Sequence, residues 1–585
     1  MKFNKTYLFI SILIGVTLFI SACSDSTDAD NSETTNSNGE PQQGGTVTGG
    51  LDTAPGGMFN PVFYTDLTEE KMLELTHESL VSQNEALEFT PNLASDWKIS
   101  DDNTEVTFTI QDGVTWHDGE AFTAEDVVFT YKTLADPEYT AAGGLRTTFV
   151  QPLLNYEVYN AGETDEFEAV TAEDEHTVTF KFEEANANML YYASFPIIPE
   201  HVFGEMEISD IPKAQASLEP SEIIGTGPFQ FSEMVEREQY VMTAYEDYWQ
   251  GTPYLDKVVW KVVDQSIMIG LLEKGELDFI AQPSNIPAPD FDSIAENPSI
   301  TTIDQTDFGY QVLGFKVNKR TTEDVENGVI NPDNWVENEK LSNKNVRKAI
   351  ANAINREGIV QGLLSGHGEV IESPIAQQFW AYDEEAVNHY SFDQEKAMGM
   401  LDEEGYVDVN DDGMREDPEG NEWVLNMNYP TGNEIRERVA PIIQEQLAEV
   451  GVNVNLRQPK EMSAYLEDIE NDNNDWDLYL IGWGLSSKDP DPSELWSSKT
   501  PYNYSRWNNP EADQLLIDAL EGEEAFDQDY REKKYAEWQK IFTDELPAVI
   551  LFAEKALWGY NTRLNGVDPL PFTMYHNTHE WWVSK

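Results

Sequence analysis

Cysteine is nearly absent from this chain of 585 residues, which contains one, Cys23. A single cysteine excludes an intrachain disulfide. Histidine is also scarce, and the eight residues are scattered without the pairing that a metal centre needs. His117, in the segment Trp116-His117-Asp118-Gly119, is predicted to be a turn histidine that hydrogen-bonds locally.

Catalytic signatures are missing as well. The sequence contains no GxSxG and no HExxH motif, and its glycine-rich segment Gly225–Phe229 is not followed by GK[ST]. This segment therefore predicts a turn into a strand rather than a phosphate loop, and the chain has no ATP site. A paired-carboxylate hydrolase stays an alternative because 108 acidic residues must bring some carboxylates together, but no pair is singled out.

Positive charge is the third scarcity, with 36 lysines and arginines against 108 acidic residues and a formal net charge of −72. Such a surface repels nucleic acid and anionic membrane faces, which excludes a nucleic-acid partner. Hydrophobic residues make up 40% of the chain, enough for large cores and too many for an acidic disordered protein. The length exceeds the roughly 250–300 residues at which one core stops growing, so two or three lobes are expected.

A long apolar run stands at the start of the chain, at Tyr7–Ile20, and is too short for a comfortable membrane span. It ends in Ile20-Ser21-Ala22-Cys23, which resembles a lipobox. Residues 1–22 are therefore predicted to be a lipoprotein signal peptide, with lipid attached to Cys23 and the protein held at the outer face of the cytoplasmic membrane. The alternative is an ordinary signal peptide with an incidental cysteine. Residues 23–45, rich in Ser, Thr, Asn and Gly, predict a flexible tether.

The stretch 89–131 is dense in structural signals. Trp97–Ile99 predicts a short strand, and the apolar residues of Val106–Ile110 alternate with polar ones, as in a half-buried strand. Two Asp-Gly turns follow. Thr123, with Asp126 three residues later, forms a near capping box and predicts the start of a helix.

The same stretch carries a family resemblance. Its pattern P-x-L-A-x-x-W, then V-x-W-H-D-G-x-x-F-T-A-x-D-V-x-F, resembles the signature of extracytoplasmic solute-binding proteins of peptide/nickel ABC importers, of the oligopeptide- and dipeptide-binding type. Further segments resemble the family, at 196–201, 225–229, 248–258 and 275–278. The resemblance covers the chain from about residue 46 to its end.

The resemblance implies an α/β, periplasmic-binding-protein-like fold. Two lobes joined by a hinge would enclose the ligand, and an extra small α/β domain would be attached. The implied boundaries are 46–85, 223–313 and 549–585 for a discontinuous domain I, 86–222 for the small domain II, and 314–548 for domain III, the second ligand-binding lobe.

Within domain III, the apolar spacing predicts two helices. The first lies near 345–360, with Arg347 and Arg356 on its outer face. The second ends at Gly451, a natural C-terminal cap, and a strand at 452–456 follows. Helix followed by strand favours a lobe with substantial parallel sheet.

The candidate ligand site follows a buried strand predicted at 477–482. In the family that the chain resembles, backbone groups of this segment pair with an extended peptide as an added strand, which gives affinity independent of the peptide's side chains. The residues concerned are Gly482, Trp483 and Gly484. Stacking on a sugar or a haem-like ring is an alternative role for the tryptophan. Thr65 and Asp66, before the first predicted helix, lie near where the family supplies the opposing backbone.

The family's ammonium-binding aspartate is missing here. It stands three residues after the tryptophan in the family, and in this chain that position is Ser486. Asp489 and Asp491 are candidates to supply the carboxylate from a different place. Two alternatives remain: the ligand's ammonium group is not fixed at all, or the segment 489–492 is only a rigid turn.

Residues 408–419 fit the calcium-loop pattern D-x-[DN]-x-[DN]-G-x5-E. The pattern offers oxygen ligands at positions 1, 3, 5 and 12 with glycine at the bend, as a hard cation requires. The candidate ligands are Asp408, Asn410, Asp412 and Glu419. A solvated acidic turn is the alternative, because the flanking helices of an EF-hand are not obvious. No other cofactor is expected.

These features together predict a lipid-anchored, monomeric substrate-binding protein of an ABC importer, and not an enzyme. It would capture oligopeptides between two lobes and deliver them to a membrane permease whose partner ATPases supply the energy. Three alternatives stay open. They are another solute on the same scaffold (a nickel complex, haem or a cello-oligosaccharide), a peptide-sensing receptor or chaperone, and a secreted hydrolase. Nickel is disfavoured by the lack of a histidine cluster.

Overall fold

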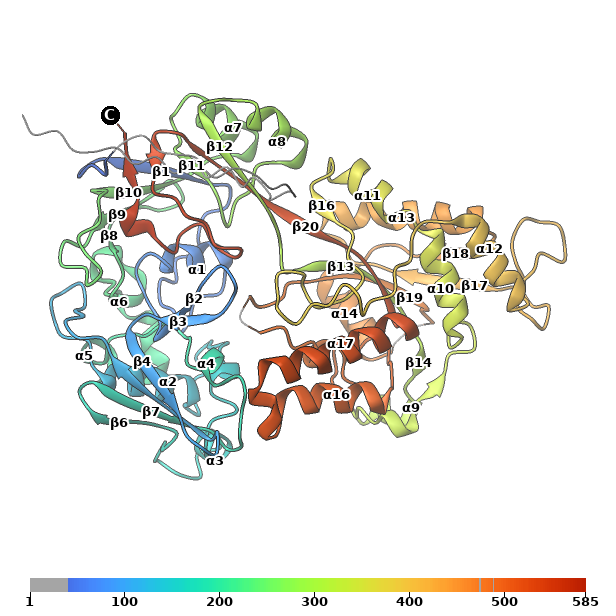
Figure 1. The fold of residues 1–585 in the computed structure, drawn as a ribbon, viewed down its shortest axis with the longest axis horizontal. Helices are drawn as coiled ribbons and strands as arrows, with labels where there is room; N and C mark the ends of the chain where they lie inside the picture. Colours follow the sequence, from blue (N-terminus) through green and yellow to red (C-terminus); the bar gives the residue numbers. More distant parts are fainter. Residues whose placement is uncertain (1–39, 473–474, 488, 585) are drawn as a thin grey trace, which may run out of the picture. The chain divides into compact units, whose positions relative to one another are not determined.

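The structure of the chain is a computed structural model that describes residues 40–472, 475–487 and 489–584 (Figure 1). The chain divides into two units, Met1–Glu40 and Pro41–Lys585, and the second contains the helices and strands described below. Cys23, the predicted signal peptide 1–22 and most of the predicted tether 23–45 lie outside the described residues. Among those described, no helix is both long and apolar enough to cross a membrane.

A mixed sheet of twelve strands dominates the described part of the chain (Figure 1). In spatial order its main path is β18 (Asn453–Leu456), β17 (Val424–Asn428), β19 (Leu478–Trp483), β13 (Tyr310–Phe315), β20 (Ala548–Asn561), β11 (Phe279–Ile280), β1 (Thr46–Leu51), β10 (Lys257–Val262), β9 (Gln239–Ala244) and β8 (Phe229–Val235). Beside this path, β12 (Ile300–Thr306) and β16 (Gly368–Glu369) pair with β20.

The 14-residue strand β20 joins the two halves of this sheet. Its first part pairs with β13, and its residues 555–561 pair with β12. Because β12 and β13 are consecutive in the chain, the halves are connected by two extended passages, β20 and the β12–β13 segment. Such a connection is expected of a hinge between lobes.

Helices accompany both halves. The half of the sheet that contains β1 and β8–β12 has the helices α1 (Leu67–Leu73), α7 (Gln265–Glu273) and α8 (Ala288–Ala295). With β13 and β16–β19 go α9 (Thr322–Glu326), α10 (Lys344–Ala353), α11 (Arg356–Leu363), α12 (Gln394–Glu403), α13 (Glu434–Glu449), α14 (Met462–Glu470), α15 (Ser493–Trp496), α16 (Pro510–Leu520) and α17 (Gln528–Glu545). The predicted cap is confirmed, since Gly451 follows α13 with a φ of +82°. Strands β17 and β18 pair in parallel, as the helix–strand order predicted.

A separate four-stranded antiparallel sheet lies in the small predicted domain. It comprises β4 (Ala94–Ile99), β5 (Glu105–Ile110), β7 (Thr177–Lys181) and β6 (Val170–Asp174), in that order. Two strands predicted from the 89–131 stretch are therefore confirmed. The predicted capping box is confirmed too, because the Thr123 N–H donates to Asp126 Oδ2 (2.9 Å) at the start of α2 (Ala124–Ala135). Shorter elements nearby are α3 (Tyr156–Asn160), α4 (Met189–Tyr192), α5 (Glu200–Phe203), α6 (Gln215–Leu218) and the hairpin β2–β3 (Val81–Gln83, Phe89–Pro91).

His117 lies in a turn, as predicted, but the prediction that it hydrogen-bonds locally was wrong. Its Nε2 lies 2.9 Å from the Gly227 carbonyl oxygen, and its Nδ1 accepts the Gly225 N–H at 3.1 Å. Burial lowers the pKa of His117 to about 4, so the ring is neutral at pH 7 and can accept this bond. The histidine thus joins two signature segments that are about a hundred residues apart in the chain.

The predicted helix near 345–360 was also wrong in two respects. It is broken at Ile354 and Asn355, because the Asn355 side chain caps α11 by accepting the Gly358 N–H (2.8 Å). Arg347 and Arg356 are buried rather than exposed. Each donates to a backbone carbonyl oxygen of a distant segment, and Arg356 also forms an ion pair with Glu372 (2.6 Å), which compensates the burial of the charges.

Buried apolar side chains form separate cores. The small sheet has its own, with Phe108, Trp116 and Tyr131. Each half of the large sheet has two cores. In one half they contain Trp260 with Trp558 and Leu272 with Ile300, and in the other half Leu425 with Ile443 and Trp476 with Trp538. Separate cores agree with a lobed protein. The domain boundaries themselves stay a prediction.

Candidate ligand-binding site

The segment at Gly482–Trp483 ends β19, a strand whose two edges differ. Along one edge, β13 pairs with all of β19, from Phe315 opposite Leu478 to Tyr310 opposite Trp483. Along the other edge, β17 pairs in the described structure only with Leu478 and Tyr479. The Tyr465 hydroxyl donates to the Leu480 carbonyl oxygen (2.7 Å) just beyond that pairing. The end of β19 therefore has an edge that another strand can join.

Trp483 belongs to a cluster of three aromatic side chains. Its ring stacks on Tyr504, with centroids 5.8 Å apart and planes inclined at 24°, and it meets Tyr502 edge-on at 6.1 Å. Trp483 is half-buried, Tyr504 is buried, and Tyr502 is 40% exposed. The sequence does not predict either tyrosine as part of the site, because both lie about twenty residues after the tryptophan in a segment without regular spacing.

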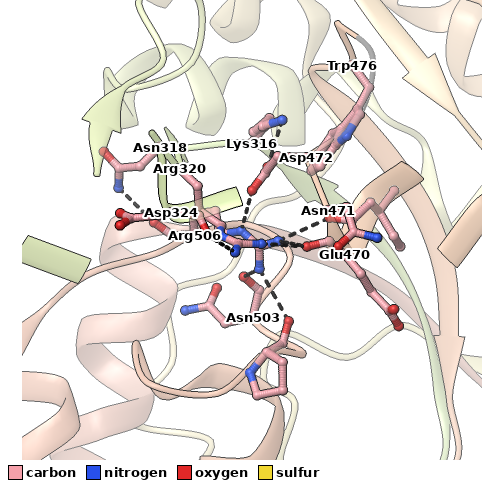
Figure 2. Close-up of polar contacts among 12 residues, drawn as sticks. Lys316, Asn318, Arg320, Asp324, Glu470, Asn471, Asp472, Trp476, Asn503 and Arg506 are labelled. Carbon is pink, nitrogen blue, oxygen red and sulfur yellow. Dashed lines mark hydrogen bonds and ion pairs between the residues drawn. The ribbon is translucent and has the colours of Figure 1, made fainter. Parts of the chain in front are cut away.

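A buried ionic network holds the segment that carries these tyrosines (Figure 2). Arg506 is fully buried and donates to the carbonyl oxygens of Asn503 (3.0 Å) and Glu470 (2.8 Å). The Asp472 carboxylate forms ion pairs with Arg506 Nε (3.0 Å) and Lys316 Nζ (2.8 Å). The Tyr504 hydroxyl donates to Glu470 Oε1 (3.2 Å), beside this network. The network therefore fixes the support under Trp483.

Gly482 lies against a buried arginine. A Cβ atom at Gly482 would lie 2.7 Å from Arg436 Nη2 and 2.8 Å from Gln311 Nε2, so no larger residue fits without displacement. Arg436 Nε donates to Gln311 Oε1 (3.2 Å), and Gln311 Nε2 donates to Glu554 Oε1 (3.0 Å). Burial lowers the pKa of Arg436 and raises that of Glu554. Sequence patterns gave no signal for this chain of three polar side chains.

Asp489 and Asp491 are brought together. The Asp491 N–H donates to Asp489 Oδ1 (2.9 Å), and Ser493 donates to Asp491 Oδ1 through its N–H (3.2 Å) and hydroxyl (2.7 Å). Arg531 Nη2 forms an ion pair with Asp489 Oδ2 (3.5 Å). Burial, strengthened by the neighbouring Asp489 charge, raises the pKa of Asp491 to about 7. Burial also raises the pKa of Asp489, although the Arg531 charge opposes that shift.

The remaining predicted site residues are more dispersed. Ser486 is exposed, and the next carbonyl oxygen, that of Ser487, accepts the Gln83 amide from β2 (3.2 Å). Asp66 caps α1 by accepting the Glu69 N–H (2.8 Å), and it also accepts the Gly56 N–H (2.9 Å). The Thr65 N–H donates to Glu69 (3.1 Å). These bonds explain Asp66 as a helix cap, and its ligand contact, like that of Thr65, stays a prediction.

The predicted calcium loop holds its own polar groups. Asp408, Asn410 and Asp412 accept backbone N–H groups of the loop at 2.8–2.9 Å. The Glu416 carboxylate accepts the Val409 N–H of the loop (2.9 Å), whereas Glu419, the predicted ligand, is exposed. In the described ranges no group of three or more histidine, cysteine, aspartate or glutamate side chains is placed to hold a metal ion. Calcium binding therefore stays a prediction that this geometry does not favour.

The family of the chain follows from its similarity to known proteins. The family model of bacterial extracellular solute-binding proteins, family 5 Middle, matches residues 88–504, more than half of the chain. The chain belongs to this family. Its members are binding proteins, so the predictions of a solute-binding protein that is not an enzyme and of a periplasmic-binding-protein-like fold are both confirmed.

Relatives of this family 5 protein differ in the ligands named for them. The oligopeptide-binding protein AppA of Bacillus subtilis (strain 168) is 30% identical over 595 residues, all of both chains. The structure of Bacillus subtilis AppA with a nonapeptide has a TM-score of 0.68 at 28% identity, covering 93% of this chain and 100% of that one. Heme-binding protein A of Haemophilus influenzae is 24% identical over 577 residues, 96% of each chain. Membership of family 5 therefore leaves the ligand of this chain to be argued from its site.

Proposed function

We propose that this family 5 protein captures oligopeptides as extended chains between its two lobes. The observation that carries the proposal is the edge of β19, where the pairing with β17 stops at Tyr479 while β19 continues to Trp483. A peptide added there as a strand would bind mainly through its backbone, with Gly482, Trp483 and Gly484 supplying the paired groups. Similarity over the whole chain to an oligopeptide-binding protein supports this ligand class.

The peptide's α-ammonium group is assigned to Asp491. Ser486, at the family's usual position, is uncharged, so we assign the pairing with the ammonium group to a carboxylate at a different position. Asp491 is the better candidate of the two aspartates, because its side-chain contacts are to the neutral donors of Ser493 whereas Asp489 has an arginine partner. Thr65 and Asp66 are proposed to lie on the opposing side of the site.

The domain organisation is proposed as the sequence predicts it. Domain I comprises 46–85, 223–313 and 549–585, domain II 86–222, and domain III 314–548. The separate cores support it, since the core around Trp260 draws on all three segments of domain I. Closing the lobes on a peptide would then rotate the halves about β20 and the β12–β13 segment.

The protein is further proposed to work as a monomeric lipoprotein of an importer. Lipid at Cys23 would hold it at the outer face of the cytoplasmic membrane, and residues 23–45 would tether it. It would deliver the peptide to membrane permease subunits and their ATPases, because the sequence itself contains no ATP-binding motif. Membership of an extracellular solute-binding family supports this location.

Native mass spectrometry of the purified protein tests the ligand class. We expect bound masses that form a series of peptides and that are recovered intact after incubation, which separates a binding protein from a hydrolase. A homogeneous haem, sugar or nickel adduct would overturn the peptide proposal. Binding of an Ala/Gly/Ser nonapeptide should also weaken when its amino terminus is acetylated, which tests the ammonium site separately.

A further inference from the structure

Arg531 of α17 lies beside the proposed ammonium site. Its side chain is 10% exposed, and it forms the ion pair with Asp489, whose side chain is 15% exposed. Three neutral groups hold it as well. Nη2 donates to Asn188 Oδ1 (3.2 Å) and to the Tyr535 hydroxyl (3.2 Å), and the guanidinium lies over the Trp380 ring at 5.1 Å. The position of the arginine is therefore set by the fold and does not depend on a ligand.

The charges at this place do not balance. Two carboxylates, Asp489 and Asp491, lie next to each other, and among the described residues Arg531 forms an ion pair with one of them, Asp489. The Arg531 charge also lowers the pKa of Asp491, against burial and the Asp489 charge, which raise it. Asp489 is thus paired directly with a cation, whereas the side-chain contacts of Asp491 are to the neutral donors of Ser493.

We propose that Arg531 limits this site to one cationic group of the ligand. It neutralises Asp489, so that Asp491 alone is left to receive that group. The inference rests on the proposed function, since it assumes that a peptide's ammonium group binds there. Arg531 is a positioning and specificity-determining residue in this scheme, and it does not need to touch the ligand.

A second observation places the same arginine at a contact between segments. Asn188 precedes α4, in the small predicted domain, whereas Arg531 and Asp489 belong to predicted domain III. The charges of Asp489 and Asp491 add to burial in raising the pKa of Tyr192, which belongs to α4. The site is therefore enclosed from both segments, which limits the water that could otherwise screen an uncompensated charge.

The test compares ligands that differ by one charge. Calorimetric titration measures the dissociation constants of an Ala/Gly/Ser nonapeptide and of the same peptide with lysine as its first residue, which carries two cationic groups at that end. The ratio of the two constants is determined for the intact protein and for Arg531→Gln, Arg531→Lys and the double variant Arg531→Gln with Asp489→Asn. Lys534→Gln is the matched control, because it removes one positive charge from the same helix at the ion pair with Asp518 (2.9 Å).

We expect Arg531→Gln to shift the ratio by about tenfold in favour of the lysine peptide, because a buried carboxylate is left without its partner. Arg531→Lys and the double variant should restore the original ratio, since each returns the site to a single net negative charge. Lys534→Gln should leave it unchanged. A general loss of stability would weaken both peptides alike, so the ratio separates the specificity role from a structural one.

The outcomes distinguish a failure of the proposed function from a failure of the inference about Arg531. If the intact protein binds neither peptide, or is indifferent to acetylation of the amino terminus, the proposed function or its ammonium site is wrong. If acetylation matters but Arg531→Gln keeps the original ratio, the inference about Arg531 is overturned. Lys488 lies outside the described residues, and a shift in Lys488→Gln as large as that in Arg531→Gln would also overturn the assignment. If Arg531→Gln does not fold, the double variant and Arg531→Lys decide, because altered selectivity in either contradicts the proposal.

Discussion

Trp483 and Tyr504 are stacked, with ring centroids 5.8 Å apart and ring planes inclined at 24°. Tyr504 is 1% exposed and is anchored through its hydroxyl to Glu470, so the tyrosine is the fixed partner of the pair. The half-buried tryptophan ends β19 beside the edge that we assign to the ligand. The stack therefore connects the buried network around Arg506 to the proposed binding segment.

Replacement of Tyr504 by leucine should weaken peptide binding without abolishing the fold. The leucine keeps an apolar side chain under Trp483 but loses the stacking contact, worth about 0.5–1.5 kcal/mol. We expect a loss of affinity of several-fold for an Ala/Gly/Ser nonapeptide in calorimetric titration. Tyr156→Leu, at a half-buried tyrosine of the small domain, is the control. Equal affinities for Tyr504→Leu and the intact protein would show that the stack does not support the site.

Two nearby glycines give a matched pair of substitutions. Alanine at Gly482 would bring its Cβ within 2.8 Å of Arg436 and Gln311, whereas alanine at Gly484 would meet nothing within 4 Å. We expect Gly482→Ala to cost about 1–3 kcal/mol of stability, as overpacked sites do, and to weaken peptide binding. Gly484→Ala should be near neutral in a urea titration. If the two variants are equally stable, the close approach of Arg436 to Gly482 is not a feature of the protein in solution.

Asp491 predicts a pH dependence of stability in the ligand-free protein. Burial raises its pKa to about 7, above the value of about 3.9 expected for an unfolded chain, so the folded state binds the proton more tightly. Its contribution therefore stabilises the protein most below about pH 4 and is lost as the pH rises through about 7. Asp491→Asn should remove this component and raise the melting temperature at pH 8 relative to the intact protein. A pH profile that is the same for both proteins would contradict the assigned shift.

The same substitution should reduce peptide affinity, because it removes the proposed partner of the α-ammonium group. We expect the loss to be larger for a free amino terminus than for an acetylated one. Ser486→Ala, at the position where the family has its aspartate, should change neither value greatly. The reverse order, with Ser486 critical and Asp491 silent, would move the ammonium site back to the usual place.

Elements with a strong local signal were predicted from the sequence, and contacts between distant segments were not. The strand at 106–110 and the cap at Thr123 depend on neighbours within a few residues, so alternation and capping patterns suffice. Arg356 was expected at the surface because helical spacing alone cannot show that carbonyl oxygens of other segments accept hydrogen bonds from its guanidinium. Asp489 and Asp491 were found as candidates because the family's aspartate is absent from its usual position. Arg531 lies some forty residues later, in the first turn of α17, and no motif indicates its role.

The buried carboxylate of Asp472 should matter more to stability than any exposed ion pair. Its side chain is 5% exposed and contacts two cations that are themselves buried, Lys316 and Arg506, with exposed fractions of 4% and 0%. Asp472→Asn keeps the shape but leaves these cations without a countercharge in a region where water cannot solvate them. Breaking a buried pair in this way typically costs about 3–5 kcal/mol.

Urea titration of the ligand-free protein measures this cost. Asp210→Asn is the control, because its partner Lys213 is 71% exposed and such surface pairs contribute little. We also expect Asp472→Asn to weaken peptide binding more than Asp210→Asn does, since the network holds the segment with Tyr502 and Tyr504 beside Trp483. A large loss of stability with unchanged affinity would show that the network stabilises the fold without supporting the binding segment.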